Sequence, residues 1–333
     1  MNIWRRYIHS TMHPIAYHGY LKRGPFFEGW YYKMVSKDGA QRFSVIPGVY
    51  IGKDASDSHC FIQVLNGVTG KSLYIPYPYE AFQASQDVVN VAIADNFFTM
   101  DEIHLDIEHA EISLHGDVQF HDQKPFPVSV TSPGIMGWFA WVPAMECYHG
   151  IVSMDHVLHG SLHYNKENIT LTGGRGYIEK DWGKAMPKAW IWMQSNQFTQ
   201  KGVSLSASIA TIPWMGFSFK GFIVALLLDD GLHRFATYNG SKITKLKVDA
   251  SKVQIVLSNT KERLYINAER VEGSNLQAPT VRQMDRRIME TLSAKIHVML
   301  YRRNKGNWEK VFDDQGMFGG LEVVGDLVSP KYT

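Results

Sequence analysis

The stretch IHLDIEHAEISLHGDVQF, residues 103–120, alternates apolar and polar side chains over most of its length. A period of two is typical of β-strands that bury one face. Comparable runs occur at 42–51, 60–67, 88–100, 168–180, 189–198, 203–212, 221–228, 252–259, 263–272 and 292–300. Turn dipeptides such as Asn66-Gly67 and Asn239-Gly240 separate neighbouring runs. The pattern predicts an all-β protein with antiparallel barrels or sandwiches and few short helices, the candidates being 281–291 and a segment near 137–148.

The composition restricts the class of protein. The chain has 333 residues, of which 45% are hydrophobic and 20% charged, and its formal net charge is +2. These values exclude a disordered chain and do not indicate a nucleic-acid partner. No apolar run reaches the ~18 residues that a membrane helix needs. The first residues lack the apolar core of a secretory signal, and Cys60 and Cys147 are too few for a disulfide framework. We therefore expect a cytoplasmic protein, with peripheral membrane contact left open.

The two halves of the chain share a weak internal similarity. Residues 28–46 and 187–207 both place a Trp before a polar turn and a strand, with Trp30 matching Trp190 and Ser44 matching Ser204. Chance similarity of two hairpins is the alternative explanation. A repeat predicts two β domains, which we place at 1–170 and 171–333.

The densest group of chemically useful side chains lies at 173–198. On a strand, Tyr177, Glu179 and Asp181 share one face, opposite Lys180 and Trp182. Two carboxyl groups on one buried face raise each other's pKa, which suits a general acid. The alternative is that these residues are solvated charges at a strand end. Glu179 and Asp181 are the candidate catalytic residues.

The next run of residues places aromatic and amide side chains on one face. Trp190 and Trp192 are followed at the same spacing by Gln194 and Asn196. Indole rings stabilise a nearby cation, and amides orient a polar group. A core stripe with its amides at the solvated end is the competing interpretation.

A third group lies near the N-terminus. The sequence FFEGWYYK, residues 26–33, puts Glu28, Trp30 and Tyr32 on one face. Glu28 is either a second acid or a hydrogen-bond acceptor that ties strands together, and the second reading is favoured.

Several kinds of site lack a signature. His149, His156, His159 and His163 lie close in sequence but without the spacing of a zinc enzyme, so no metal site is expected. The chain has no GxSxG elbow, no phosphate loop and no dinucleotide fingerprint in the required context. If the protein is an enzyme, we expect acid–base chemistry without a cofactor.

These motifs together resemble the tocopherol cyclase family. The similarity covers HPIAYHGY (13–20), FFEGWYYK (26–33), PGIMGW (133–138) and MECYHG (145–150). It is most specific in GYIEKDWGKAMPKAWIWMQSNQF (176–198), and GLEVVGDL (320–327) also fits. Unlike the plant enzymes of this family, the chain shows no plastid transit peptide.

The resemblance implies a pair of lipocalin-like domains and a reaction class. Tocopherol cyclases protonate a prenyl double bond, and a phenol oxygen captures the resulting cation. By this resemblance Asp181 or Glu179 is the acid, with Trp182, Trp190 and Trp192 beside the cation. The predicted substrate contacts are Glu28, Trp30, Tyr32, Tyr177, Trp182, Trp190, Trp192, Gln194 and Asn196. The predicted partner is a lipophilic small molecule, bound either for cofactor-free cyclisation, hydration or isomerisation, or by a non-catalytic carrier. A structural or interaction protein is a third, weaker alternative.

Overall fold

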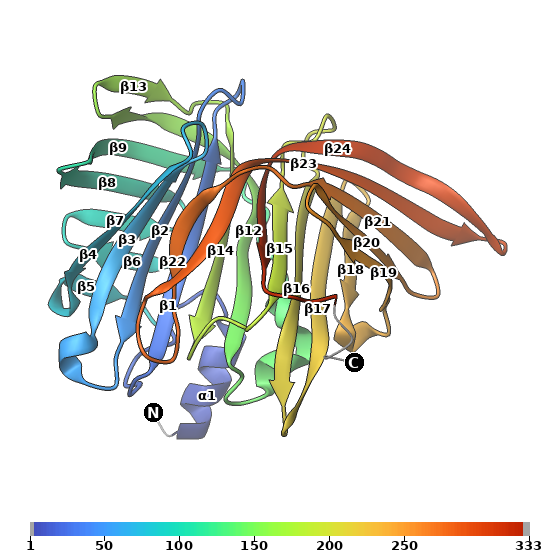
Figure 1. Ribbon diagram of the computed structural model, residues 1–333, viewed down its shortest axis with the longest axis horizontal. Helices are drawn as coiled ribbons and strands as arrows, with labels where there is room; N and C mark the ends of the chain where they lie inside the picture. Colours follow the sequence, from blue (N-terminus) through green and yellow to red (C-terminus); the bar gives the residue numbers. More distant parts are fainter. Residues whose placement is uncertain (1–2, 329–333) are drawn as a thin grey trace. The chain divides into compact units, whose positions relative to one another are not determined.

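The structure, a computed structural model, describes residues 3–328 and is built almost entirely of antiparallel strands (Figure 1). Two large sheets account for most of it, one of 12 strands and one of 10. The chain divides into two compact units. Unit 1 contains residues 1–186 and 276–287, and unit 2 contains residues 187–275 and 288–333. The all-β prediction is confirmed.

The sheet of unit 1 is a single path of strands in which most neighbours are joined by hairpins. Its order is β4 (Lys71–Pro78), β3 (His59–Asn66), β2 (Arg42–Ile51), β1 (Phe26–Val35), β14 (Arg175–Gly183), β12 (Cys147–Tyr164), β9 (Ile112–His121), β8 (Glu102–His109), β7 (Asn96–Thr99), β6 (Asn90–Ile93) and β5 (Phe82–Ala84). Strand β13 (Glu167–Thr170) pairs with β12, and β10 (Val128–Ser129) pairs with β11 (Ser132–Pro133). The alternating side chains of this sheet enclose one apolar core, which includes Trp30, Tyr32 and Ile178.

Short helices lie between and before these strands. Helix α1 (Ile3–Met12) precedes β1, and the 3₁₀ segments are η1 (Ala55–Asp57), η2 (Tyr79–Ala81), η3 (Gly134–Trp141) and η4 (Thr237–Asn239). The segment expected near 137–148 corresponds in part to η3, which Gly137 interrupts with a φ of 58°. The sequence pattern did not predict α1.

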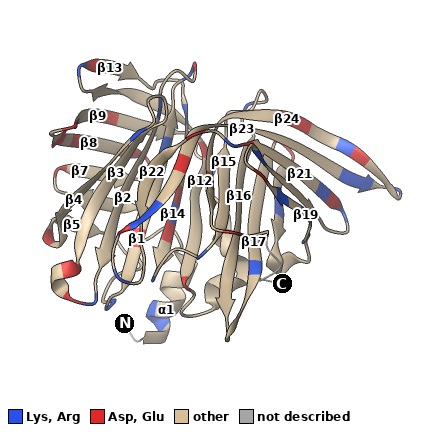
Figure 2. Cartoon of the chain, in the orientation of Figure 1, with Lys and Arg blue, Asp and Glu red and all other residues tan. Residues whose placement is uncertain are grey.

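The sheet of unit 2 repeats the same order of hairpins. It runs β18 (Gly231–Ala236), β17 (Phe217–Leu228), β16 (Ser204–Trp214), β15 (Trp190–Ser195), β24 (Asn307–Val324), β23 (Arg286–Asn304), β21 (Glu262–Glu269), β20 (Lys252–Ser258) and β19 (Lys242–Val248). Strand β22 (Ser274–Ala278), whose residues from 276 onward are counted in unit 1, pairs with β23. Trp30 and Trp190 lie in β1 and β15, and Ser44 and Ser204 lie in β2 and β16. Residues matched by the sequence repeat thus lie in strands that hold corresponding positions in the orders of the two sheets. The ends of β23 and β24 that meet at the turn near residues 304–307 carry charges of both signs (Figure 2).

The prediction of a helix over 281–291 is wrong. Strand β23 begins at Arg286, and its burial alternates, with Ile288 and Glu290 buried and Met289 exposed between them. This period of two overrides the apparent helical spacing.

Unit 1 includes a segment that comes late in the chain. The side-chain amide of Gln63 in β3 donates to the carbonyl of Gln277 at 2.9 Å and accepts from its N–H at 2.8 Å. Met284 joins a buried cluster with Phe27, Tyr50 and Phe61. The segment 276–287 is therefore packed as part of unit 1. The chain passes from unit 1 to unit 2 after residue 186, so β14 stays in the same unit as its partners β1 and β12. The division into domains at residue 170 stays a prediction.

Candidate active site

Strand β14 is the centre of the candidate site because it lies between β1 and β12 (Figure 1). In the register, Asp181 is opposite Gly29 of β1 and His149 of β12, and Lys180 is opposite Trp30 and Gly150. Successive residues of a strand point to opposite faces. The prediction that Glu179 and Asp181 lie on one face of the strand and Lys180 on the other is confirmed.

Four side chains meet on the odd-numbered face of β14. We call His149, Tyr177, Glu179 and Asp181 the imidazole–carboxylate cluster. Nδ1 of His149 lies 2.9 Å from Oδ1 of Asp181, and its Nε2 lies 3.5 Å from Oε2 of Glu179. The Tyr177 hydroxyl donates to Oε2 of Glu179 at 2.5 Å. One imidazole thus lies between two carboxyl groups, both of which the sequence singled out.

The cluster holds a proton on its imidazole. Burial alone disfavours the charged ring, but the carboxylates of Glu179 and Asp181 outweigh that cost and raise the pKa of His149 to about 9. At neutral pH the ring is an imidazolium, and both of its nitrogens carry a hydrogen. The side chain of Asp181 is 29% exposed, whereas those of His149 and Glu179 are 9% and 5% exposed. Asp181 is therefore the member of the cluster most accessible to another molecule.

The same three residues have the composition of a metal site. The ligand atoms of His149, Glu179 and Asp181 lie within 4.8 Å of one another. However, the two carboxylates face different nitrogens of the ring, and a metal ion binds only one nitrogen of an imidazole. A cation would also have to displace the proton that both carboxylates stabilise. The geometry therefore fits a shared proton better than a metal ion.

The even-numbered face of β14 holds a different group of charges. The ammonium of Lys180 pairs with Oε1 of Glu28, and Oε2 of Glu28 accepts the backbone N–H of His18 at 2.8 Å. Nδ1 of His18 lies 3.1 Å from the same carboxylate. Burial and the nearby Lys180 charge lower the pKa of His18, so its ring is neutral. We call Glu28, Lys180 and His18 the buried ion pair; Glu28 ties the N-terminal segment to the sheet.

Aromatic rings surround this buried ion pair. The ammonium of Lys180 lies 4.6 Å from the ring centre of Trp30 and 4.9 Å from that of Trp182. Trp182 is stacked between His18 and Tyr148, with ring centres 4.2 and 5.4 Å away. Trp182 also lines a pocket of about 170 Å³, to which α1 contributes Tyr7, Ser10 and Thr11. Trp182 therefore lies on the face of β14 opposite Asp181, and its contact with substrate stays a prediction.

The remaining predicted contacts of unit 1 follow the same alternation. Trp30 and Tyr32 point into the core, and the Tyr32 hydroxyl donates to the carbonyl of Thr99 at 2.9 Å. Tyr177 belongs instead to the imidazole–carboxylate cluster. The substrate roles predicted for Glu28, Trp30, Tyr32 and Tyr177 are not tested by these contacts.

The predicted aromatic stripe of unit 2 is found on β15. Ile191 and Met193 point into the core of unit 2, so Trp190, Trp192 and Gln194 lie on the other face of the strand. All three are buried, as is Asn196 just beyond the strand. The indole of Trp190 donates to Oε2 of Glu322 in β24 at 2.5 Å. The stripe is therefore not part of that core, and its contact with substrate stays a prediction.

Sequence reasoning did not identify His149, Lys180 or His18 as members of these groups. The sequence places His149 close to the other histidines of β12, which the structure separates. His156 packs against Phe120, and burial lowers its pKa to about 3, so it stays neutral. The missing signal was the pairing of β12 with β14, which places His149 opposite Asp181.

Comparison with known proteins identifies the family. A family model described as tocopherol cyclase-like matches residues 123–325, which is 203 of 333 residues. The chain belongs to the tocopherol cyclase-like family. The match includes every member of the imidazole–carboxylate cluster, whereas Glu28 and His18 precede it.

Solved structures share the fold of this family member at low sequence identity. An AttH protein of Nitrosomonas europaea aligns with a TM-score of 0.51 at 13% identity, over 93% of this chain and 94% of that protein. CghA, solved with Sch210972, aligns with a TM-score of 0.53 at 11% identity, over 90% of this chain and 89% of that protein.

No helix within residues 3–328 of this family member is long and apolar enough to cross a membrane.

Proposed function

We propose that this member of the tocopherol cyclase-like family is an enzyme that protonates a carbon–carbon double bond of a prenylated aromatic or other isoprenoid. The outcome is cyclisation, hydration or isomerisation without a cofactor. The imidazole–carboxylate cluster carries the proposal, because it concentrates a proton beside a partly exposed carboxyl group. The family match covers the residues that form it.

Asp181 is the proposed acid. Asp181 receives the Nδ1 proton of the His149 imidazolium, 2.9 Å away, and transfers it to the less substituted alkene carbon. The step leaves a tertiary carbocation, the Asp181 carboxylate and a neutral His149. In cyclisation the phenol oxygen then bonds to the cation, and its proton returns through the Asp181 carboxylate to His149, so that substrate and product are isomers. In hydration a water molecule bonds to the cation instead and loses one proton by the same route.

Glu179 and Tyr177 are proposed to position His149. The Glu179 carboxylate faces Nε2 of the ring, and the Tyr177 hydroxyl hydrogen-bonds that carboxylate. This arrangement keeps a hydrogen on Nδ1, directed at Asp181. Trp190, Trp192, Gln194 and Asn196 remain proposed substrate contacts, since indole rings stabilise carbocations and amides orient phenols.

The test is turnover of a phytyl-hydroquinone by the purified chain in D₂O, followed by mass spectrometry. Cyclisation leaves one non-exchangeable deuterium on carbon, and hydration adds the mass of heavy water. Either product supports proton-initiated catalysis. Recovery of unchanged substrate bound to the protein supports a carrier and contradicts the proposal.

Variants then identify the acid. Asp181→Asn should lower turnover by at least about 100-fold, which is the size of a general-acid contribution. Asp117→Asn is the matched control, because Asp117 makes an exposed ion pair with His104 at 2.7 Å on the same sheet. Full activity of Asp181→Asn with loss of activity in Glu179→Gln would transfer the role to Glu179.

A further inference from the structure

The N-terminal part of unit 1 exposes an unusual number of large apolar side chains. Trp4 is 72% exposed and Leu21 is 69% exposed. Trp4 and Ile8 are four residues apart on α1 and so share one face of the helix. We define the N-terminal surface as Ile3, Trp4, Ile8, Tyr20 and Leu21 together with the basic residues Arg5, Arg6, Lys22 and Arg23. A soluble surface rarely exposes so many large apolar residues within 20 residues of chain.

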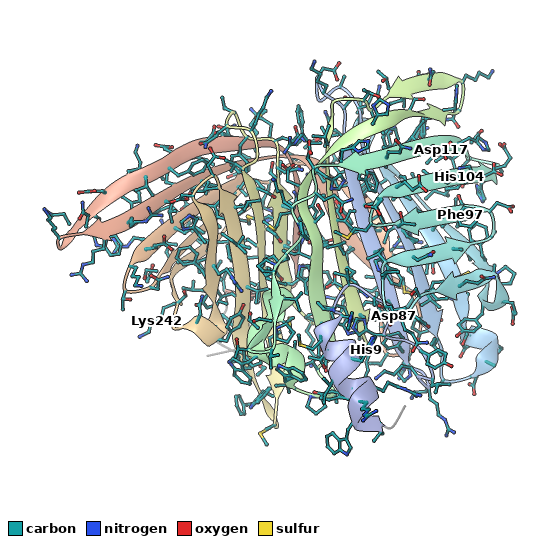
Figure 3. All side chains as sticks on the ribbon, turned by 180° about the vertical axis from the view of Figure 1, so that it is seen from behind. His9, Asp87, Phe97, His104, Asp117 and Lys242 are labelled. Carbon is teal, nitrogen blue, oxygen red and sulfur yellow. The ribbon has the colours of Figure 1, made fainter. Side chains whose placement is uncertain are left out.

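Contacts hold the elements of this surface together. The guanidinium of Arg6 on α1 lies 5.7 Å from the ring centre of Tyr20, which places the loop at 20–23 beside the helix. Tyr7 packs on Trp141 of η3, with ring centres 6.2 Å apart. Nε2 of His9 pairs with Asp87 at 3.0 Å (Figure 3). Helix α1 is therefore fixed on unit 1 by these contacts while Trp4 and Ile8 stay exposed.

The charge of this surface is of one sign. Residues 1–27 contain Arg5, Arg6, Lys22 and Arg23 and no Asp or Glu. Helix α1 accordingly shows basic but no acidic residues in Figure 2. Asp87, an acidic residue that contacts the helix, is paired with His9.

We infer that the N-terminal surface docks on an anionic lipid bilayer. Basic side chains bind anionic headgroups, and Trp and Leu side chains insert at the boundary with the acyl chains. The nearby pocket favours a membrane over an acidic protein, because Tyr7, Ser10, Lys22 and Arg23 line it together with mostly apolar residues. A lipophilic molecule dissolved in the bilayer would meet that pocket without crossing water.

The test is flotation of the purified full chain with vesicles of phosphatidylcholine alone or with added phosphatidylglycerol. We expect binding to the anionic vesicles, weakened by salt. Trp4→Ala with Leu21→Ala should weaken binding at least about tenfold, and Lys22→Glu with Arg23→Glu should do the same. Phe97→Ala removes an exposed apolar residue elsewhere on unit 1, and Lys242→Glu changes an exposed charge in unit 2 (Figure 3). Both controls should bind like the original chain.

Three results would overturn the inference. The first is that the chain binds neither kind of vesicle, and the second is that it binds both equally. The third is that the chain self-associates, and that the Trp4 and Leu21 substitutions abolish this self-association without changing vesicle binding. The last result would assign the surface to a second copy of the chain. Vesicle binding is measured without substrate, so it can fail while turnover succeeds, and the reverse.

Discussion

The two faces of β14 place ionisable groups in opposite situations. On the even-numbered face, one ammonium and one carboxylate are matched and fully enclosed, with the neutral ring of His18 beside them. On the odd-numbered face, one imidazolium faces two carboxyl groups, and one of these is partly exposed. The first arrangement satisfies its charges internally. The second contains one carboxyl group more than it has cations.

The comparison teaches that burial alone does not distinguish the proposed acid, Asp181, from Glu28. Glu28 is more buried than Asp181, yet its oxygens are occupied by Lys180 and His18. A functional acid requires access and a charge imbalance as well as a non-polar environment. Four predictions test whether the two faces differ in this way.

The largest expected effect is on the buried ion pair. Lys180→Met leaves the Glu28 carboxylate buried without its cation, which should lower the free energy of unfolding by about 3–5 kcal/mol. Urea unfolding measures the change. Adding Glu28→Gln should restore much of the loss, because the unpaired charge is then removed. Unchanged stability of Lys180→Met would show that the two faces do not differ as described.

The imidazole–carboxylate cluster should make stability depend on pH. The pKa of His149 is about 9 in the folded chain and ordinarily 6.5. Its contribution to the free energy of unfolding is therefore fully present below pH 6.5 and is lost as pH rises through about 9, by up to about 3 kcal/mol. His115 and His233 also have raised pKa values. The measurement is therefore the difference in free energy of unfolding between the original chain and His149→Gln across this range. Parallel curves for the two proteins would contradict the prediction.

Substitutions of two glycines compare how tightly the two faces of β14 are packed. A Cβ added to Gly150 would lie 3.1 Å from the carbonyl of Pro14 and 3.2 Å from the Trp182 ring. Gly150→Ala should therefore cost about 1–3 kcal/mol. On the opposite face, a Cβ on Gly29 would meet Ile46 at an ordinary 3.7 Å.

Gly29→Ala serves as the matched substitution, and its free energy of unfolding should stay within about 0.5 kcal/mol of the original. The same urea measurement gives both values. Equal costs at the two sites would remove the proposed difference in packing.

The smallest effect is expected at the exposed pair of His104 and Asp117. Both side chains are substantially solvated, at 43% and 73% exposure. Asp117→Asn should change the free energy of unfolding by at most about 1 kcal/mol. A larger loss would mean that even exposed His–Asp pairs matter in this sheet, and that the cluster on β14 is not distinctive for stability.

Much of this architecture could be predicted from alternation alone. The period of two gave the all-β class and the sides of β14 on which Lys180 and Asp181 lie, because a strand leaves no other choice. The repeat that joins Trp30 to Trp190 indicated that β1 and β15 are equivalent strands. Apparent helical spacing misled in one place, at 281–291, where the buried Ile288 and Glu290 and the exposed Met289 follow the alternation of strand β23.

The partners across strands could not be predicted in the same way. His149 and Asp181 are 32 residues apart, and nothing local to either residue specifies the register of β12 with β14. That register also contains shifts between Ile151 and His156, which a simple alternation would not locate. Lys180 illustrates a second difficulty, because a lysine is rarely buried, and its partner Glu28 lies 152 residues earlier.

The late segment 276–287 has a consequence for synthesis of the chain. When residue 186 leaves the ribosome, β3 still lacks the partner of Gln63, and Phe27, Tyr50 and Phe61 still lack Met284. Translation must continue past β21 before this part of unit 1 can be completed. A gene truncated after residue 186 therefore encodes an unfinished unit with an uncovered apolar patch. An independent unit 1 requires the 276–287 segment to be grafted back, for example through a new linker.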